Sequence, residues 1–163
     1  MRHALRGRLL YLWTLELLNA LLVFPAVYAM AAARFRLGWY SHAALGLVCV
    51  LLVVGALYWY LKWRSLRKGY RLAATPARGF FRACKAILGA ALAGLALLGL
   101  ARSIGKAAAT SEMVVGGLLT IMAALEYINY YYWQLSYDTP AEFLALLRRR
   151  RPKKATMVRD FGI

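Results

Sequence analysis

Four long apolar stretches constrain this 163-residue chain more than any other feature of its sequence. They cover about residues 9–33, 40–61, 83–101 and 113–135. Each is about 20 residues long, the length of a helix that crosses the hydrocarbon core of a bilayer. Hydrophobic residues make up 63% of the chain and charged residues 17%, which is more apolar than an ordinary soluble domain. The sequence therefore predicts an all-α integral membrane protein with four transmembrane helices in a bundle.

Three local patterns refine this prediction. Pro25 lacks a backbone N–H, so it predicts a kink in the first span. Ala86, Ala90 and Gly94 recur at four-residue spacing in the third span, which predicts close approach of a neighbouring helix. The basic stretch 62–82 is predicted to be a long connection on the membrane surface. Cleavage of the first span as a signal peptide is a less favoured alternative, because that span is long for a signal core.

The chain is expected to divide into a bundle over residues 1–137 and a cytoplasmic region over 138–163. In the second region, Thr139 is a good N-cap and Glu142, three residues later, completes a capping box. A helix over about 140–151 follows, with leucine and phenylalanine on one side. It is too short to span a bilayer, so the sequence predicts an amphipathic helix at the interface. The rest of the basic tail is expected to be partly disordered.

Lysine and arginine are distributed unequally along the chain, whose net charge is +16. Of the 22 basic residues, 18 lie before the first span, around the connection between the second and third spans, or after the fourth. The positive-inside rule places those three segments in the cytoplasm. The sequence therefore predicts a multi-pass protein of the plasma or inner membrane with both termini in the cytoplasm.

The basic face is expected to bind anionic lipid headgroups. The predicted contacts are Arg64, Arg67, Lys68, Arg71, Arg148, Arg149, Arg150 and Arg151. Nucleic acid is a less favoured partner, because membrane orientation already accounts for the charge. A protein partner or a second copy of the chain within the membrane is an open alternative. The sequence shows no catalytic triad, phosphate-binding loop or metal-ligand spacing, so no catalytic residue, metal or cofactor is predicted.

Two polar motifs interrupt the apolar stretches. The first and fourth spans both read Leu-Glu-x-x-Asn, with Glu16 and Asn19 in one and Glu126 and Asn129 in the other. Glu16 lies roughly 10 Å inside the first span, and Glu126 lies roughly 13 Å inside the fourth. Because the two spans run in opposite directions, direct packing would place Asn129 near Glu16 and Asn19 near Glu126. Each carboxamide would then donate to the opposite carboxylate.

These polar groups need partners, because burying them in lipid is expensive. One interpretation is a hydrogen-bonded clamp that selects the helix pairing, at about 0.6–2 kcal/mol for each bond. The other is a proton or ion site, because two carboxylates in a low-dielectric setting cannot both ionise cheaply. Tyr127, Tyr130 and Gln134 are candidate lining residues of such a site. For the tyrosines, an interfacial aromatic belt is the alternative.

Glu16 in the first of four spans resembles the membrane-embedded glutamate of the small multidrug resistance transporters. The resemblance covers this glutamate and the number of spans, and it implies transport. Those proteins are shorter and lack the strong charge bias and basic C-terminal region seen here. The residues themselves favour a non-enzymatic accessory, scaffold or membrane-organising protein held on anionic lipid. A small proton-coupled transporter or ion pathway that uses Glu16 and Glu126 is the alternative.

Overall fold

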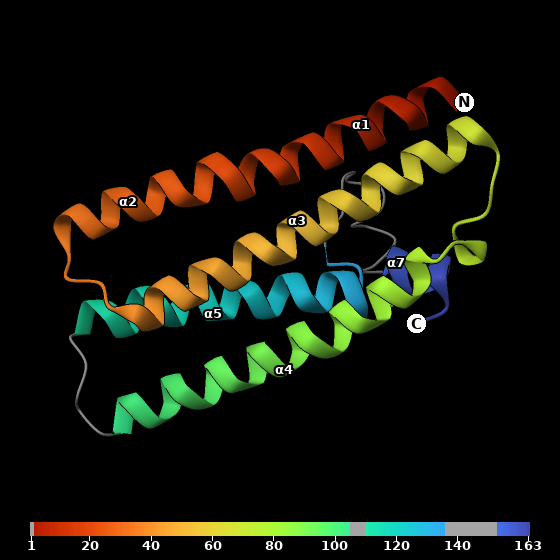
Figure 1. Cartoon of the computed structure of the whole chain (residues 1–163). Helices are drawn as coiled ribbons and strands as arrows, with labels where there is room; N and C mark the ends of the chain where they lie inside the picture. Colours follow the sequence, from red (N-terminus) through yellow and green to blue (C-terminus); the bar gives the residue numbers. More distant parts are fainter. Residues whose placement is uncertain (1, 105–109, 136–152) are drawn as a thin grey trace, which may run out of the picture.

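The computed structural model describes residues 2–104, 110–135 and 153–163, with side chains from residue 7 onward. This part of the chain is helical and contains no strand. Its long helices run alongside one another as a bundle (Figure 1). The helices long and apolar enough to cross a membrane are Gly7–Arg34, Trp39–Lys68, Ala77–Ile104 and Thr110–Tyr131. The predicted all-helical fold with four helices of spanning length is therefore confirmed, and it suggests a multi-pass membrane protein.

The first span is continuous but irregular. It consists of α1 (Arg2–Leu18), a π turn (Asn19–Val23) and α2 (Phe24–Arg34). In the π turn the Phe24 N–H donates to the Asn19 carbonyl, five residues back. Pro25 follows directly and cannot donate, so the wider turn accommodates the missing hydrogen bond. Where a kink was predicted at Pro25, the structure has a π turn within one continuous helical rod (Figure 1).

The second span, α3 (Trp39–Lys68), is the centre of the bundle. In an apolar stretch of 18 residues within this helix, 50% of the stretch is buried, whereas the corresponding value for the first span is 6%. Ala44, Val48 and Leu51 on this helix are completely buried. Helices α1, α4 and α5 all pack against α3, whereas the described residues show no extended packing of α1 along α5. The predicted packing of the first span along the fourth is therefore absent from the described residues, although Tyr130 of the fourth span reaches Glu16 of the first.

Helices α4 (Ala77–Ile104) and α5 (Thr110–Tyr131) pack together through a glycine, although not one in the predicted small-residue row. A Cβ on Gly89 would overlap the hydroxyl group of Tyr127, so the absent side chain makes room for that ring. The residues predicted to form the close contact are instead exposed, namely Ala86, Ala90 and Gly94. Which face of α4 is covered depends on large side chains of α5, such as Tyr127. The spacing of small residues within α4 therefore cannot predict that face.

The basic connection between the second and third spans is shorter than predicted. Helix α3 continues to Lys68 and ends at Gly69, whose φ of 73° is the left-handed conformation of a helix C-cap. A 3₁₀ turn (Leu72–Ala74) follows, and α4 begins at Ala77. Residues 62–68 of the basic stretch thus belong to α3 and residues 77–82 to α4, because both helices extend beyond their apolar residues.

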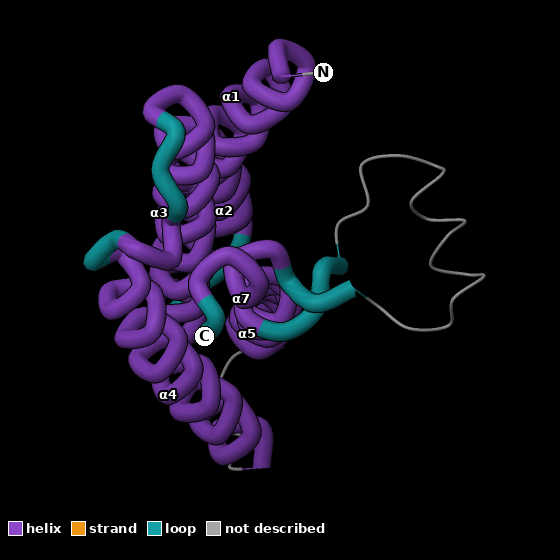
Figure 2. The backbone as a smooth tube through the Cα atoms, turned by 90° about the vertical axis from the view of Figure 1, so that its right-hand side faces the viewer, coloured by secondary structure: helices purple, strands orange, loops and turns teal. Residues whose placement is uncertain are grey.

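The C-terminal residues pack onto the bundle. Gln134 N donates to Lys153 O at 2.9 Å, and Ala155 N donates to Tyr132 O at 3.0 Å. These bonds lead into the short helix α7 (Thr156–Phe161), which lies at the end of the bundle (Figure 2). The expected disorder of the tail is therefore wrong for 153–163. The predicted interfacial helix over 140–151 lies outside the described residues.

Two side chains of α7 anchor it to the core. Met157 and Phe161 are each only 1% exposed. The Phe161 ring stacks on Phe81 of α4 at a centroid distance of 4.9 Å and meets Tyr58 of α3 edge-on at 6.0 Å. The tail holds few apolar residues, but these two are enough to fix it against α3 and α4.

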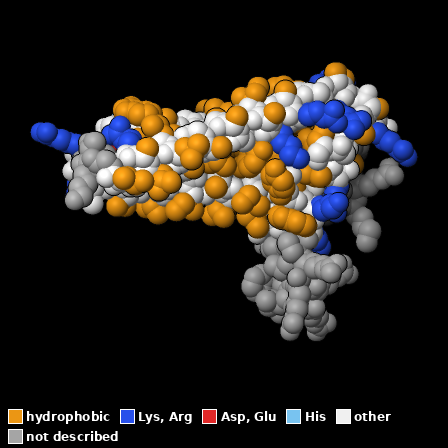
Figure 3. All heavy atoms as spheres, turned by 90° about the horizontal axis from the view of Figure 1, so that it is seen from below, with side chains coloured by type: hydrophobic (Ala, Val, Ile, Leu, Met, Phe, Trp, Pro, Cys, Tyr) orange, Lys and Arg blue, Asp and Glu red, His pale blue; other side chains and the backbone are white. Residues whose placement is uncertain are grey.

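Charge and apolar surface are separated along the bundle. On the face shown in Figure 3, hydrophobic side chains cover the middle of the bundle, and Lys and Arg lie toward its two ends. The chain termini are at the same end, together with the C-terminal end of α3 and the start of α4 (Figure 1). We call this end, which carries the described residues 2–8, 62–85 and 153–163, the basic end. The other end carries Arg34, Arg36 and Arg102 among the described basic residues.

Candidate functional site

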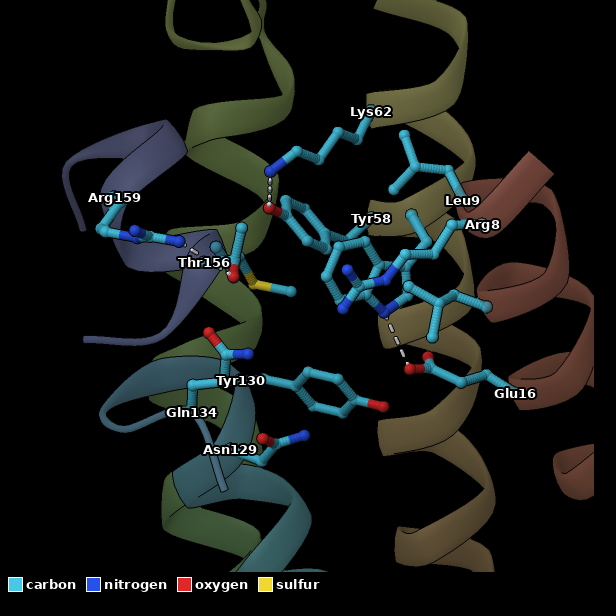
Figure 4. Close-up of a pocket in the computed structure, with 13 residues that line it drawn as sticks. Arg8, Leu9, Glu16, Tyr58, Lys62, Asn129, Tyr130, Gln134, Thr156 and Arg159 are labelled. Atoms are coloured by element: carbon cyan, nitrogen blue, oxygen red, sulfur yellow. Dashed lines mark hydrogen bonds between the residues drawn. The ribbon is translucent and has the colours of Figure 1, made fainter. Parts of the chain in front are cut away.

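A pocket of about 250 Å³ lies at the basic end, between α1, α3, α5 and α7 (Figure 4). Its charged lining residues are Arg8, Glu16, Lys62 and Arg159. Its uncharged polar lining residues are Tyr58, Asn129, Tyr130, Gln134 and Thr156. Leu9, Leu12, Trp59 and Met157 complete the wall. The pocket therefore combines charged groups, amide groups and apolar surface at the basic end of the bundle.

Glu16 is held against the central helix by an indole. Trp59 Nε1 donates to Glu16 Oε1 at 2.8 Å. The other oxygen, Oε2, is buried and has no hydrogen-bond partner among the described residues. The hydroxyl group of Tyr130 lies beside this carboxylate. A Cβ on Gly55 would overlap both Glu16 Oε2 and the Tyr130 hydroxyl, so this glycine of α3 makes room for their approach.

Tyr130 connects the acidic residues of the two Leu-Glu-x-x-Asn motifs. It lies on α5, one turn after Glu126, and its hydroxyl group interacts with both Glu16 and Glu126. Asn129 also interacts with Glu126, and its Oδ1 accepts a hydrogen bond from Leu135 N at 2.8 Å. The Tyr130 side chain therefore links the carboxylate of Glu16 on α1 with that of Glu126 on α5. It can do so because α1 and α5 both pack against α3.

The structure brings only some of the predicted site residues into the pocket. Glu16 and Asn129, one from each motif, both line it, together with Tyr130 and Gln134. Glu126 and Asn19 are outside the lining, and Asn19 begins the π turn of the first span. The predicted contact of Asn19 with Glu126 is therefore not part of this site.

Tyr127 belongs to a different contact. Its hydroxyl group donates to Lys85 O on α4 at 2.8 Å. Its ring lies 5.1 Å from that of Tyr131, centroid to centroid. Tyr127 therefore helps to pack α5 against α4, and it does not line the pocket.

Sequence reasoning missed the wall that α7 provides. Asp160 Oδ2 lies 2.7 Å from Lys62 Nζ and accepts a hydrogen bond of 2.6 Å from the Tyr58 hydroxyl. These contacts fix α7 beside α3, and they place Thr156 and Arg159 at the pocket. Asp160 is the one acidic residue after Glu142 in a strongly basic tail, and this was the signal that could have suggested a partner for Lys62.

A second polar cluster at the opposite end was also missed. Glu112, in the first turn of α5, is only 5% exposed, and its Oε2 lies 3.2 Å from the Arg102 guanidinium. Its Oε1 accepts a hydrogen bond from Tyr40 N in the first turn of α3, at 3.3 Å. No side chain of α3 caps that terminus, so a carboxylate from α5 does so. In the sequence, Glu112 lies between the predicted third and fourth spans, where such a role is not visible.

The residues predicted to contact lipid headgroups lie at the basic end where they are described. Arg64, Arg67 and Lys68 are in the last turns of α3, Arg71 follows it, and all four are exposed. The Arg67 guanidinium lies over the Trp63 ring at 5.0 Å. The other predicted contacts, Arg148, Arg149, Arg150 and Arg151, lie outside the described residues.

Comparison of the chain with protein-family models, with curated proteins and with solved structures gave no match. The pocket, the polar clusters and the distribution of charge are therefore the basis for a functional proposal.

Proposed function

We propose that this protein is a non-enzymatic accessory or scaffold component of the plasma or inner membrane, whose basic end faces the cytoplasm and binds anionic lipid. The observation that carries the proposal is the separation of charge seen in Figure 3, with an apolar middle and basic residues at the ends. A surface of this kind suits the hydrocarbon core, and the ends suit the two headgroup layers.

The two ends of the bundle differ in their number of exposed cations, and this difference supports the proposed orientation in the membrane. Exposed cations of the described basic end include Arg8, Arg64, Arg67, Lys68, Arg71, Arg78, Arg82, Lys154 and Arg159. At the other end, Arg34 and Arg36 are exposed, whereas Arg102 is paired with Glu112. Each Lys or Arg near an anionic surface contributes about 1 kcal/mol of attraction. The basic end therefore favours the anionic cytoplasmic leaflet, with both termini on that side.

Reporter fusions test the orientation. A reporter that is active only in the cytoplasm is fused to either terminus, and we expect activity from both fusions. A matched set carries a reporter that is active only outside the cytoplasm, and it should stay silent. Intact C-terminal fusions with the opposite pattern would contradict the orientation.

Lipid retention tests the proposed binding. The full chain is reconstituted in nanodiscs with a fixed fraction of anionic phospholipid, and the lipid kept after solubilisation at low salt is counted. We expect enrichment of anionic over zwitterionic lipid, and we expect it to fall as salt shortens the range of exposed charges. Equal retention of both lipid classes at low salt would contradict the proposal.

Proton or ion passage is a second candidate function, and one observation favours it. The Tyr130 hydroxyl group interacts with Glu16 and Glu126, which places two carboxylates and a phenol in one polar group within the bundle. Such intramembrane ionisable residues mark proton relays in many transporters. Under this function, Glu16→Gln should fold normally but abolish proton flux in vesicles. If wild-type protein shows no flux above empty vesicles under imposed gradients of pH and potential, this second function is wrong.

A further inference from the structure

A second pocket, with a volume of about 340 Å³, lies at the basic end. Its lining comes from the last turns of α3, from the 3₁₀ turn with the residue before it, and from α7. Figure 1 shows α7 at the end of the bundle where α3 ends and α4 begins. Arg71 precedes the 3₁₀ turn and Arg159 is on α7, so two arginines from distant parts of the sequence line one cavity. We call this cavity the arginine pocket.

Positive charge exceeds negative charge in the lining of the arginine pocket. Its other charged residues are Lys62 and Asp160. The Asp160 carboxylate already binds Lys62 Nζ at 2.7 Å and the Tyr58 hydroxyl at 2.6 Å. Within the part of the chain that the structure describes, neither arginine has an ion pair, and Arg159 donates only a long hydrogen bond of 3.4 Å to Thr156. Three cations and one carboxylate therefore give the lining a net charge of +2.

This charge matches a phosphate monoester better than other common anions. A phosphate monoester carries about 1.5 to 2 negative charges at neutral pH and presents three acceptor oxygens. A guanidinium group can form paired, charge-assisted hydrogen bonds with such oxygens. Arg71 and Arg159 are both exposed, so their side chains are free to turn toward an entering phosphate. A carboxylate or a phosphate diester brings a single negative charge and would leave the lining partly uncompensated.

Size and apolar surface limit the rest of the ligand. The volume of about 340 Å³ is near the lower end of the roughly 300–1,000 Å³ typical of small-molecule sites. Leu66 and Leu72 give the pocket an apolar wall, and Leu72 is only 7% exposed. The Ser65 hydroxyl is buried and donates to Lys62 O at 2.8 Å, so the arginines remain the main donors. A phosphate with a small carbon body fits this combination.

We propose that the arginine pocket binds a small phosphate monoester, with Arg71 and Arg159 holding the phosphate. The monoester comes from a soluble molecule or from a lipid headgroup, and the experiment below distinguishes the two sources. Because Arg71 precedes the 3₁₀ turn and Arg159 is on α7, the bound phosphate joins these segments and stabilises the attachment of α7. The proposal goes beyond the proposed function, because the site requires no particular orientation in the membrane.

Two pairs of probes test the ligand class and its source. The full chain in micelles of an uncharged detergent is titrated with glycerol 3-phosphate and with dimethyl phosphate by calorimetry. The full chain in nanodiscs receives equal fractions of phosphatidic acid and phosphatidylglycerol, and the lipid retained after solubilisation is counted by native mass spectrometry. In each pair the first probe is a monoester and the second is an anionic diester.

We expect one monoester to bind per chain, at least tenfold more tightly than its diester, because the diester lacks a charge and an acceptor oxygen. Tight binding of glycerol 3-phosphate identifies a soluble ligand, and selective retention of phosphatidic acid identifies a lipid. The proposal is overturned if neither monoester is preferred over its diester.

Two pairs of substitutions locate the bound monoester. Arg71→Gln with Arg159→Gln should weaken its binding at least tenfold, because hydrogen bonds to charged groups are lost. The control pair, Arg64→Gln with Arg82→Gln, removes the same charge from exposed positions of the basic end that do not line this pocket, and affinity should change less than twofold. Unchanged affinity in the first pair would overturn the proposal, as would equal loss in both pairs. Lysine in place of both pocket arginines keeps the charge without the paired geometry and should give an intermediate affinity.

The attachment of α7 provides a readout that does not depend on measuring affinity. At a monoester concentration 100 times its dissociation constant, limited proteolysis should release the C-terminal segment about 100-fold more slowly, because binding requires α7 in place. The same concentration should not protect Arg71→Gln, a variant whose substitution lies outside α7 and leaves the anchors of that helix intact. Equal release with and without the bound monoester in the wild type would contradict the bridging role of the phosphate.

The two proposals fail in different ways. If the reporter fusions or the low-salt retention of anionic lipid fail, the proposed function is wrong, whereas the monoester titration in uncharged micelles is unaffected. If anionic lipid is preferred at low salt but neither monoester is preferred over its diester, only the arginine pocket proposal is wrong.

Discussion

Replacing Gly55 with alanine should destabilise the bundle at its polar centre. Gly55 is on α3, and a Cβ there would overlap Glu16 Oε2 and the Tyr130 hydroxyl group. Because both groups are buried within the bundle, they cannot simply move into solvent. Overpacking of this kind typically costs about 1–3 kcal/mol. The same change stabilises a helix by roughly 0.5–1 kcal/mol, so a single variant would underestimate the cost of the overlap.

Gly46→Ala provides the matched control. Gly46 lies on the same helix, is exposed, and a Cβ there would meet no atom within 4 Å. The gain in helix propensity is common to both variants and cancels when they are compared. We therefore expect Gly55→Ala to be about 1–3 kcal/mol less stable than Gly46→Ala.

Reversible unfolding in mixed micelles measures this difference. Helicity is followed by circular dichroism as the fraction of denaturing detergent rises. A Cβ on Gly55 would also overlap Cζ of the Tyr130 ring, so Tyr130→Leu is the change that removes the overlapping end of this side chain. Adding Tyr130→Leu to Gly55→Ala should therefore show coupling of about 0.5 kcal/mol or more. Equal stability of Gly55→Ala and Gly46→Ala would refute the idea that this glycine lets Glu16 and Tyr130 approach each other.

Three further substitutions test contacts that hold the ends of the bundle and the pocket. Asp160→Asn should weaken the attachment of α7 by roughly 1–2 kcal/mol, because its ion pair with α3 is lost. Limited proteolysis should then release the C-terminal segment faster, while the spans stay protected. Glu112→Ala should cost roughly 1–3 kcal/mol in unfolding free energy, because Arg102 loses its partner and the terminus of α3 loses its cap. Trp59→Phe should cost roughly 1–3 kcal/mol, because Glu16 loses its indole donor, and a conservative change elsewhere on α3 should not.

The sequence predicted the number and type of the long elements because each depends on local composition. A run of about 20 apolar residues specifies a spanning helix whatever its neighbours are. The ends of the helices were less predictable. Helix α3 extends to Lys68 and α4 starts at Ala77, so both continue through basic residues outside the apolar run. Hydropathy marks the part of a helix suited to lipid, and the backbone hydrogen bonds continue further.

Neighbour relations were not predictable, because they depend on side chains that meet across helices. The two Leu-Glu-x-x-Asn motifs suggested direct contact between the first and fourth spans. The structure instead places α3 between them, with Gly55 making room for Tyr130 next to Glu16. Position along the spans predicted that Glu16 and Asn129 lie at a similar level, and both residues line the pocket. Such positions contain no information about which helix lies in the middle.

The C-terminal wall of the pocket shows how a few residues override the general character of a segment. The tail is basic and polar, and such composition favours disorder. Phe161 nevertheless stacks on the core at 4.9 Å, and Asp160 pairs with Lys62 at 2.7 Å. These contacts position Arg159 opposite Arg8, so the pocket requires both ends of the described chain. The motifs of the first and fourth spans therefore located one side of the site, whereas its closing wall depends on long-range contacts that local sequence patterns do not reveal.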